Sequence, residues 1–196
     1  MLASLLAENL LQTAIDAVAD AGDLHSVLEA LPAPIYVTDS DGVVTHFNKA
    51  CIGFAGRMPA IGKDRWCVTW KLYTDDGVFL PHDACPMAEA IHGRKIVRGV
   101  TAVAERPDGV RVTFMPLPTP LFGVDGQLVG AINMLIDVTE HRQIAELREN
   151  ARRCHRLAVG NTDQRLSDTL KQMAAEYEIK AEDLEETVRE RPRLVA

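Results

Sequence analysis

The chain has 196 residues, enough for one well-packed core with peripheral helices and too few for two domains of ordinary size. Hydrophobic residues make up 47% and charged residues 25% of it, as in most soluble globular proteins. The net charge of -7 gives a phosphate backbone no general electrostatic attraction, so we expect no nucleic-acid partner.

The cysteines and the N-terminal stretch predict a cytoplasmic protein. The four cysteines have no paired spacing, which favours reduced thiols: Cys51, Cys67, Cys85 and Cys154. The first twenty residues are rich in Leu and Ala but carry acidic residues and no basic flank, which argues against a signal peptide. No uninterrupted apolar stretch reaches ~18 residues, so we expect no membrane insertion.

Residues 1–23 are predicted to form an amphipathic helix that stops at Gly22. Its apolar residues recur at helical spacing: Leu2, Leu5, Leu6, Leu10, Ile15, Val18 and Ala21. This face must be buried on its own domain or on a second copy, and its Leu content favours a homodimer. Asp23 then caps a second short helix that runs to Leu31.

From residue 35 the apolar period changes to that of strands. Residues 35–38 and 43–47 flank Asp39-Ser40-Asp41-Gly42, whose residues tolerate the backbone angles of a hairpin turn. Asn48 opens a short helix over residues 49–55, which Gly56 ends.

The middle of the chain is irregular, and strands return after it. Short helices and loops are expected over residues 57–95, including a helix from about Asp83 to Ile91. Strands follow over residues 97–105 and 110–116, and Pro116, Pro118 and Pro120 end that pairing or place it at an edge. A last strand covers residues 128–136. The order predicts an α+β fold with an antiparallel sheet.

The last strand is predicted to lead directly into a helix. Asp137 and Glu140 have the spacing with which two side chains satisfy free backbone amides of a first turn, so Asp137 is the expected cap. The helix continues to residue 158, and a second begins at Thr162 or Asp163. The second helix has one apolar stripe: Leu166, Leu170, Met173, Tyr177, Ala181, Leu184 and Val188. Residues 139–192 thus form a helical hairpin or a bent coiled coil that ends at Pro192.

These features together resemble a PAS domain. The strand–Asp-x-x-Gly–strand hairpin, Asn48-Lys49-Ala50 and the closing Asp137-Val138-Thr139-Glu140 match family motifs, and the resemblance covers residues 24–142. It implies a PAS domain at residues 24–138, with a five-stranded antiparallel sheet, short helices on one face and a ligand cavity in some members. It also implies that the domain senses or dimerises and passes a change along a flanking helix, with Asp137, Thr139 and Glu140 as the junction.

The aromatic residues before the second set of strands have two interpretations. Trp66, Trp70 and Tyr73 either close the core under the short helices, which we favour, or line a pocket for a small organic ligand. Thr113 or Asn133 would then supply the hydrogen-bonding group. The sequence leaves open whether Asn133 points into the pocket or to the opposite face.

The sequence leaves the cofactor unknown and favours none. A flavin-type light sensor of the family needs a reactive Cys in Asn-Cys-Arg-Phe-Leu-Gln, where this chain has Arg65-Trp66-Cys67-Val68-Thr69-Trp70. His92 is the candidate axial ligand for haem but fits a polar helix end better. His82 and Cys85 could form half of a metal site, although no second pair has matching spacing.

Two classes of function follow. The first is a cytoplasmic signalling protein that dimerises and relays a signal to a partner such as a histidine kinase. The second is a phosphotransfer protein that uses His155 on the helix after the sheet. Arg156 follows His155, where kinase acceptor runs carry an acidic residue, and no glycine-rich nucleotide-binding segment is present, so we do not expect an enzyme.

Overall fold

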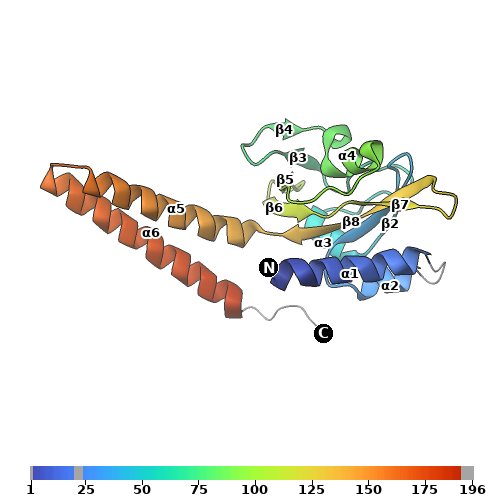
Figure 1. Ribbon diagram of the computed structural model, residues 1–196, viewed down its shortest axis with the longest axis horizontal. Coiled ribbons are helices and arrows are strands. Elements are labelled where there is room, and N and C mark those ends of the chain that lie inside the picture. Colours follow the sequence, from blue (N-terminus) through green and yellow to red (C-terminus); the bar gives the residue numbers. More distant parts are fainter. Residues whose placement is uncertain (1, 20–23, 191–196) are drawn as a thin grey trace. The chain divides into compact units, whose positions relative to one another are not determined.

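The computed structural model describes residues 2–19 and 24–190 of the chain. It contains two compact units, Met1–Asp137 and Val138–Ala196 (Figure 1). The predicted stop at Gly22, the cap at Asp23 and the helix end at Pro192 lie outside the described residues. No helix in the described part combines the length and apolarity needed to cross a membrane.

The first unit is built on an antiparallel sheet of eight strands. Their bounds are β1 (Ile35–Asp39), β2 (Val44–Phe47), β3 (Lys71–Tyr73), β4 (Phe79–Leu80), β5 (Ala102–Glu105), β6 (Arg111–Pro116), β7 (Thr119–Phe122) and β8 (Leu128–Asp137). The order is β2-β1-β8-β6-β5-β3-β4, with β7 on β8. The sequence correctly predicts the α+β class and the first hairpin. It misses β3, β4 and β7 and starts the third predicted strand five residues before β5.

Two strands share one edge of β8. The end of β6 pairs with residues 135–137, and β7 pairs with residues 128–132 further along the same strand. β6 ends at Pro116, as the prolines predict, and only Leu117 and Pro118 separate it from β7. Leu117 N still donates to the Met134 carbonyl oxygen of β8 at 2.9 Å. Pro120 lies within β7, opposite Ala131.

One face of the sheet carries the short helices of the middle segment. These are α3 (Lys49–Ala55), the 3-10 turn η1 (His82–Ala84) and α4 (Pro86–Gly93). Cys85 is the N-cap of α4 and Pro86 occupies its first turn, where a missing N–H costs nothing. The core on this face, here called the inner core, gathers large side chains such as Tyr36, Phe54, Trp66 and Phe114.

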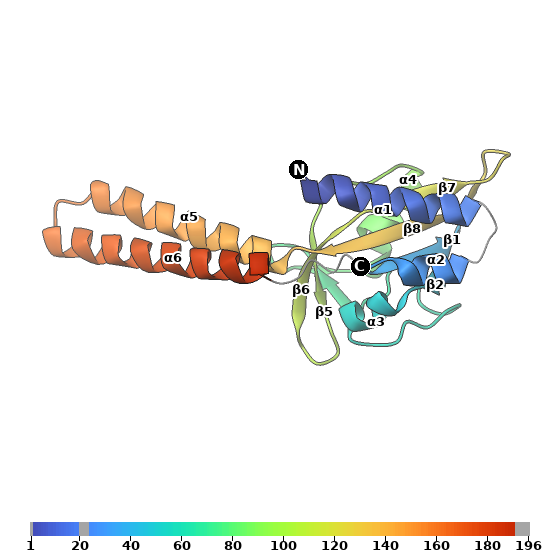
Figure 2. The same ribbon diagram turned by 90° about the horizontal axis from the view of Figure 1, so that it is seen from below.

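The opposite face is covered by α1 (Leu2–Ala19) and α2 (Leu24–Ala30), as Figure 2 shows. Ala7, Leu11 and Ala14 of α1 are buried in one apolar cluster with Ile132 and Met134 of β8. Leu10 and Ile15, the described members of the predicted apolar face of α1, pack against this cluster, so this part of the face lies on its own sheet, which is the first of the two alternatives from the sequence. Dimerisation through α1 stays a prediction.

An ion pair holds α1 to a loop beside the sheet. Arg98 Nε donates to Glu8 Oε1 at 2.8 Å. The same guanidinium donates to the carbonyl oxygens of Val97 and Pro118 and to Thr119 Oγ1, each at 2.9 Å. The Arg98 side chain thus joins its own loop to α1 and to the start of β7.

The second unit is an antiparallel helical hairpin of α5 (Thr139–Val159) and α6 (Gln164–Glu190). Small residues dominate the buried seam between the helices: Ala151, Cys154, Ala158, Ser167, Ala174 and Ala181. Ser167 Oγ donates to the carbonyl oxygen of Ala158 at 3.2 Å beside the connecting loop. The hairpin is the first of the two predicted forms of this region.

Candidate functional site

A chain of hydrogen bonds crosses the inner core. Asn133 Nδ2 of β8 donates to the Tyr36 hydroxyl of β1 at 3.0 Å, and that hydroxyl donates to the carbonyl oxygen of Trp66 at 2.9 Å. Asn133 Oδ1 accepts the backbone N–H of Leu117 at 2.9 Å. Asn133 therefore points into the inner core, which resolves the choice that the sequence left open. We call Tyr36, Asn133 and the Trp66 carbonyl the polar chain.

The polar chain and Leu117, which bonds Asn133, bring together four separate segments. Tyr36 lies on β1, Asn133 lies at the middle of β8, and Leu117 lies between β6 and β7. The carbonyl of Trp66 belongs to the irregular segment before β3. Each member is buried, so a polar group that loses its partner in this network cannot form a replacement hydrogen bond with water.

Trp66 is held in an unusual backbone conformation. Its φ is +68°, and Cys67 N donates to the carbonyl oxygen of Arg65 at 2.8 Å, which together make a γ-turn with positive φ. Such a conformation costs on the order of 1–3 kcal/mol in a residue with a side chain. Trp66 N donates to the Gly42 carbonyl at 2.7 Å, which ties the turn to the first hairpin.

Two buried thiols, Cys67 and Cys85, lie in the inner core beside this turn. Cys85 Sγ lies 3.9 Å from the Trp66 carbonyl oxygen, and Cys67 Sγ lies 3.1 Å from Thr69 Oγ1. Burial raises the pKa of Cys85 to about 12, and it also raises the pKa of Cys67. Burial likewise raises the pKa of the Tyr36 hydroxyl well above its usual 10.0. The cluster is therefore neutral at physiological pH, and its thiols are poor nucleophiles.

Asn48 has a role that the sequence did not reveal. It is the N-cap of α3, as predicted, but its side chain makes no capping hydrogen bond. Instead Nδ2 donates to the carbonyl oxygens of Leu28, Leu31 and Ala33, and Oδ1 accepts from Ile35 N. One buried side chain thus fastens the segment after α2 to β1.

The aromatic candidates separate into different environments. Trp66 is 9% exposed and belongs to the inner core, whereas Trp70 is 52% exposed, so the prediction that Trp70 closes the core is wrong. Its place in a pocket wall stays a prediction. Tyr73 and Thr113 alternate with the buried Leu72 and Val112 on their strands and so face away from the inner core. The guanidinium of Arg111 stacks 4.4 Å from the Tyr73 ring centre.

The haem and metal candidates do not come together. His92 is exposed at the end of α4, and its ring contacts the Trp66 ring edge-on at 4.8 Å. His82 Nε2 and Arg57 Nε are buried, and neither has a hydrogen-bond partner among the described residues. Burial, with the nearby Arg57 charge second, lowers the pKa of His82. The described residues contain no group of three or more His, Cys, Asp or Glu side chains placed to bind a metal ion.

The junction differs from its prediction by one residue. β8 ends at Asp137, α5 begins at Thr139, and the N-cap is Val138, whose side chain makes no capping hydrogen bond. Asp137 is thus the residue before the cap, and its predicted role as the N-cap is wrong. A single residue separates the strand that carries Asn133 from α5.

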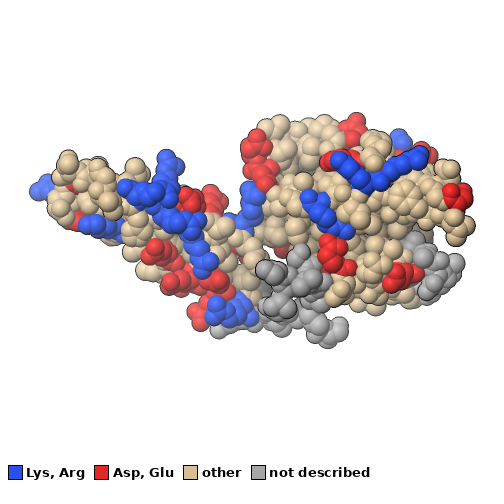
Figure 3. Space-filling view, in the orientation of Figure 1, with Lys and Arg blue, Asp and Glu red and all other residues tan. Residues whose placement is uncertain are grey.

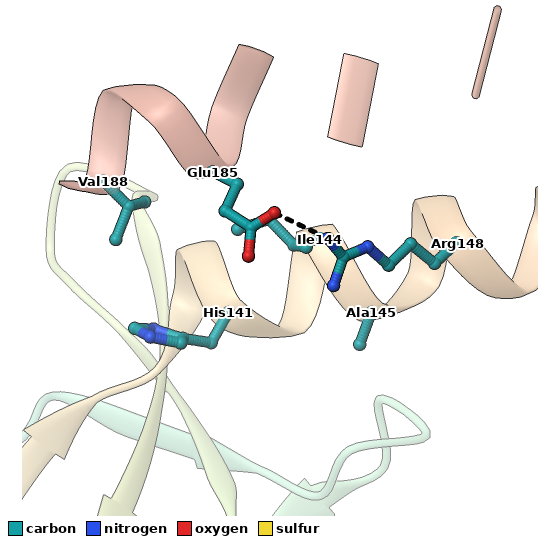
Figure 4. Close-up of a pocket in the computed structure, with 6 residues that line it drawn as sticks. All are labelled: His141, Ile144, Ala145, Arg148, Glu185 and Val188. Carbon is teal, nitrogen blue, oxygen red and sulfur yellow. Dashed lines mark hydrogen bonds and ion pairs between the residues drawn. The ribbon is translucent and has the colours of Figure 1, made fainter. Parts of the chain in front are cut away.

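The hairpin has two unlike sides. On one, Arg148 of α5 donates to Glu185 of α6 at 2.6 Å beside Ile144 and Val188, at a groove of about 210 Å³ (Figure 4). His155 Nε2 lies 3.3 Å from Glu178 Oε1 on this side. The other side has a groove of about 330 Å³ lined by Leu147 and Leu184 with polar neighbours. Acidic and basic side chains gather on the face of the hairpin seen in Figure 3.

Comparison with known families gives one match. Residues 28–143 match the model of a family described as PAS fold, which covers more than half of the 196-residue chain. No curated protein matches the chain.

Solved structures of PAS and light-oxygen-voltage (LOV) domains are similar to it. An RNA-binding LOV receptor is 21% identical with a TM-score of 0.46, over 60% of this chain and 33% of that one. A PAS domain from Colwellia psychrerythraea is 17% identical with a TM-score of 0.40, over 59% and 93%. The LOV domain of a blue-light activated histidine kinase from Erythrobacter litoralis is 18% identical with a TM-score of 0.41, over 56% and 98%. The chain thus spans a third of the receptor's length. At these scores the likeness carries no information on ligand, partner or activity.

Proposed function

The chain belongs to the PAS-fold family, and from this premise we propose that it is a cytoplasmic signalling protein that relays a change in its inner core to a partner. The partner in this proposal is another signalling protein, such as a histidine kinase, and the chain acts as a homodimer. Its role is regulatory binding rather than catalysis.

The observation that carries the proposal is the position of Asn133. This residue bonds the buried Tyr36 hydroxyl and lies on the strand that continues, through Val138 alone, into α5. A change in the hydrogen bonds of the polar chain would alter the pairing of β8 with its neighbouring strands. Because only one residue separates the end of β8 from α5, such a change would also reach the first turn of α5. The relay needs no cofactor, although a small ligand that displaced the Tyr36 hydroxyl would act through the same bonds.

Hydrogen exchange tests the relay with a matched pair of variants. Tyr36→Phe removes the hydroxyl between Asn133 and Trp66, and Thr69→Val removes another buried hydroxyl that contacts Cys67 rather than β8. We expect faster exchange in β8 and in residues 139–146 for Tyr36→Phe alone. Exchange in residues 139–146 that matches the wild type would contradict a relay through this network. Native mass and absorption spectra of the purified protein would detect a retained ligand.

A second function remains open for His155. The side chain is exposed on a two-helix hairpin, as a phospho-accepting histidine must be, and Glu178 lies beside its ring. Incubation with a labelled, phosphorylated response regulator tests this function. Label that appears on the wild type and disappears in His155→Ala would support phosphotransfer, and an unlabelled wild type would exclude it for that regulator.

A further inference from the structure

Helix α6 has two adjacent stripes that differ in the size and the burial of their side chains. The first stripe consists of small residues, Ser167, Ala174 and Ala181, buried in the seam with α5. The second lies next to it and consists of large residues at the steps of three and four typical of a coiled coil: Leu166, Leu170, Met173, Tyr177 and Leu184. A helix with two such stripes is suited to a bundle of more than two helices.

The large residues remain accessible on the hairpin. Leu166 is 46% exposed and Met173 is 40% exposed, and Leu170, Tyr177 and Leu184 are half-buried. On α5, Leu147 and Leu157 flank the same side, and Leu157 is 53% exposed. Leu147 and Leu184 line one groove, which shows that the two helices contribute to a common face. We call these seven side chains the open face.

The open face contrasts with the side closed by ion pairs. The Arg148–Glu185 and His155–Glu178 contacts join α5 to α6 on the other side of the small-residue seam. A seam in which small residues dominate buries little apolar area per residue, so the hairpin gains limited hydrophobic stabilisation by itself.

We propose that the open face binds the open face of a second copy, so that two hairpins form a four-helix bundle with a two-fold axis along the helices. The seven side chains expose on the order of 400 Å² of apolar surface per hairpin, or about 800 Å² for the pair. Polar residues at the rim of the contact would bring the total buried area to the ~1,000 Å² that a specific interface needs. The two-fold axis satisfies each face with an identical one.

Charge complementarity supports a second copy as the occupant. The Arg148–Glu185 and His155–Glu178 contacts show which residues of α5 and α6 lie at the same height along the antiparallel hairpin. In this register Arg153 of α5 lies at the height of Lys180 of α6. The two-fold axis keeps the second copy at the same level and places its α5 beside α6. Arg153 of the second copy then lies between Glu176 and Asp183, one turn to either side of Lys180. The Lys180 stem can lie along the stripe with its ammonium in solvent.

The same levels match the apolar residues. Leu157 of the second copy falls beside Met173 and Tyr177, and Leu147 of the second copy falls beside Leu184. Among the described residues Arg153 has no carboxylate partner in its own chain, so its pairing is left for the interface.

Sedimentation equilibrium of the full chain tests the proposal with one matched pair. Leu170→Glu places a carboxylate on the open face, and Ile179→Glu places one on the outer side of the same helix, at a residue that is 56% exposed. We expect the wild type and Ile179→Glu to be dimers, and Leu170→Glu to dissociate at least tenfold more readily. A monomeric wild type, or a Leu170→Glu dimer as tight as the control, would overturn the proposal.

A charge exchange tests the register. Arg153→Glu should weaken the dimer, and adding Glu176→Arg and Asp183→Arg to it should restore most of the affinity. Failure of the exchange to restore any affinity would overturn the two-fold arrangement. The inference rests on the homodimer of the proposed function. The relay from Tyr36 to residues 139–146 is measured separately, so either idea can fail alone.

Discussion

The Tyr36 hydroxyl and the Asn133 side-chain amide lie 3.0 Å apart in the inner core, although 97 positions separate them in the chain. Tyr36 and Asn133 also face each other across the β1–β8 ladder as direct partners. The side-chain bond therefore reinforces a backbone register that already places the two residues together.

The first prediction is that this bond couples the two residues energetically. Tyr36→Phe and Asn133→Ala should each lower the free energy of unfolding by roughly 1–3 kcal/mol, because each leaves a buried group without its partner. The double variant should lose less than the sum, with a coupling of about 0.5–1.5 kcal/mol by urea denaturation. Additive losses would show that the two side chains act independently.

The second prediction concerns the support of Trp66 by Gly42. A Cβ at Gly42 would lie 2.2 Å from the Trp66 ring, whereas a Cβ at Gly77 would meet nothing, and both residues have positive φ, +82° and +84°. Gly77→Ala should cost about 1 kcal/mol from backbone strain alone. Gly42→Ala should cost roughly 2–4 kcal/mol because the ring must also move. Equal midpoints in urea would contradict the close packing of Trp66.

The third prediction separates the two tryptophans. Trp66→Ala removes a buried ring and should cost roughly 3–5 kcal/mol. Trp70→Ala removes a ring that is 52% exposed and should cost less than about 1 kcal/mol. Thermal melts of both variants measure the difference. A loss at Trp70 as large as that at Trp66 would place Trp70 in the core after all.

These residues show what the sequence could predict. Local sequence determines three features whose positions were predicted to within two residues: the first hairpin, the helix that begins after Asn48, and the junction between β8 and α5. The burial of Trp66 and the exposure of Trp70 depend on the γ-turn at Trp66, which no local sequence pattern predicts. The partners of Asn48 and Tyr36 are set by the tertiary fold. A buried tyrosine that needs a hydrogen-bond partner and a lone Asn in an apolar strand were the available signals.

The fourth prediction follows from the four bonds of Asn48. Asn48→Ala leaves the carbonyl oxygens of Leu28 and Ala33 and the Ile35 N–H without this partner, at roughly 2–4 kcal/mol. Asn161→Ala is the control, because Asn161 makes a local bond to Asp163 N near the surface and should cost less than about 1 kcal/mol. Hydrogen exchange should rise in α2 and β1 in the first variant. Unchanged exchange there would show that the segment is held by its apolar contacts.

The fifth prediction is a pH dependence at His82. Burial lowers its pKa below 6.5 in the folded protein, so the unfolded chain takes up the proton first as the pH falls. The contribution of His82 is therefore fully present above pH ~6.5 and is lost as the pH falls toward the lowered pKa of the folded state.

A comparison with His82→Gln isolates this effect. Between pH 7 and pH 5 the wild type should lose more thermal stability than the variant, which cannot be protonated there. The lowered carboxylate pKa values of Glu105 and Glu149 act at lower pH and are common to both proteins. Parallel melting curves over this range would contradict the lowered pKa of His82.

The proline within β7 bears on the behaviour of the protein at high concentration. β7 continues its ladder with β8 on both sides of Pro120, so the ring nitrogen, which cannot donate, is accommodated at the outer edge of the strand. An incoming strand from another molecule would find no N–H at that position and could not extend the sheet continuously. The missing N–H of Pro120 thus makes this edge a poor template for the continuous strand pairing of fibrillar aggregates.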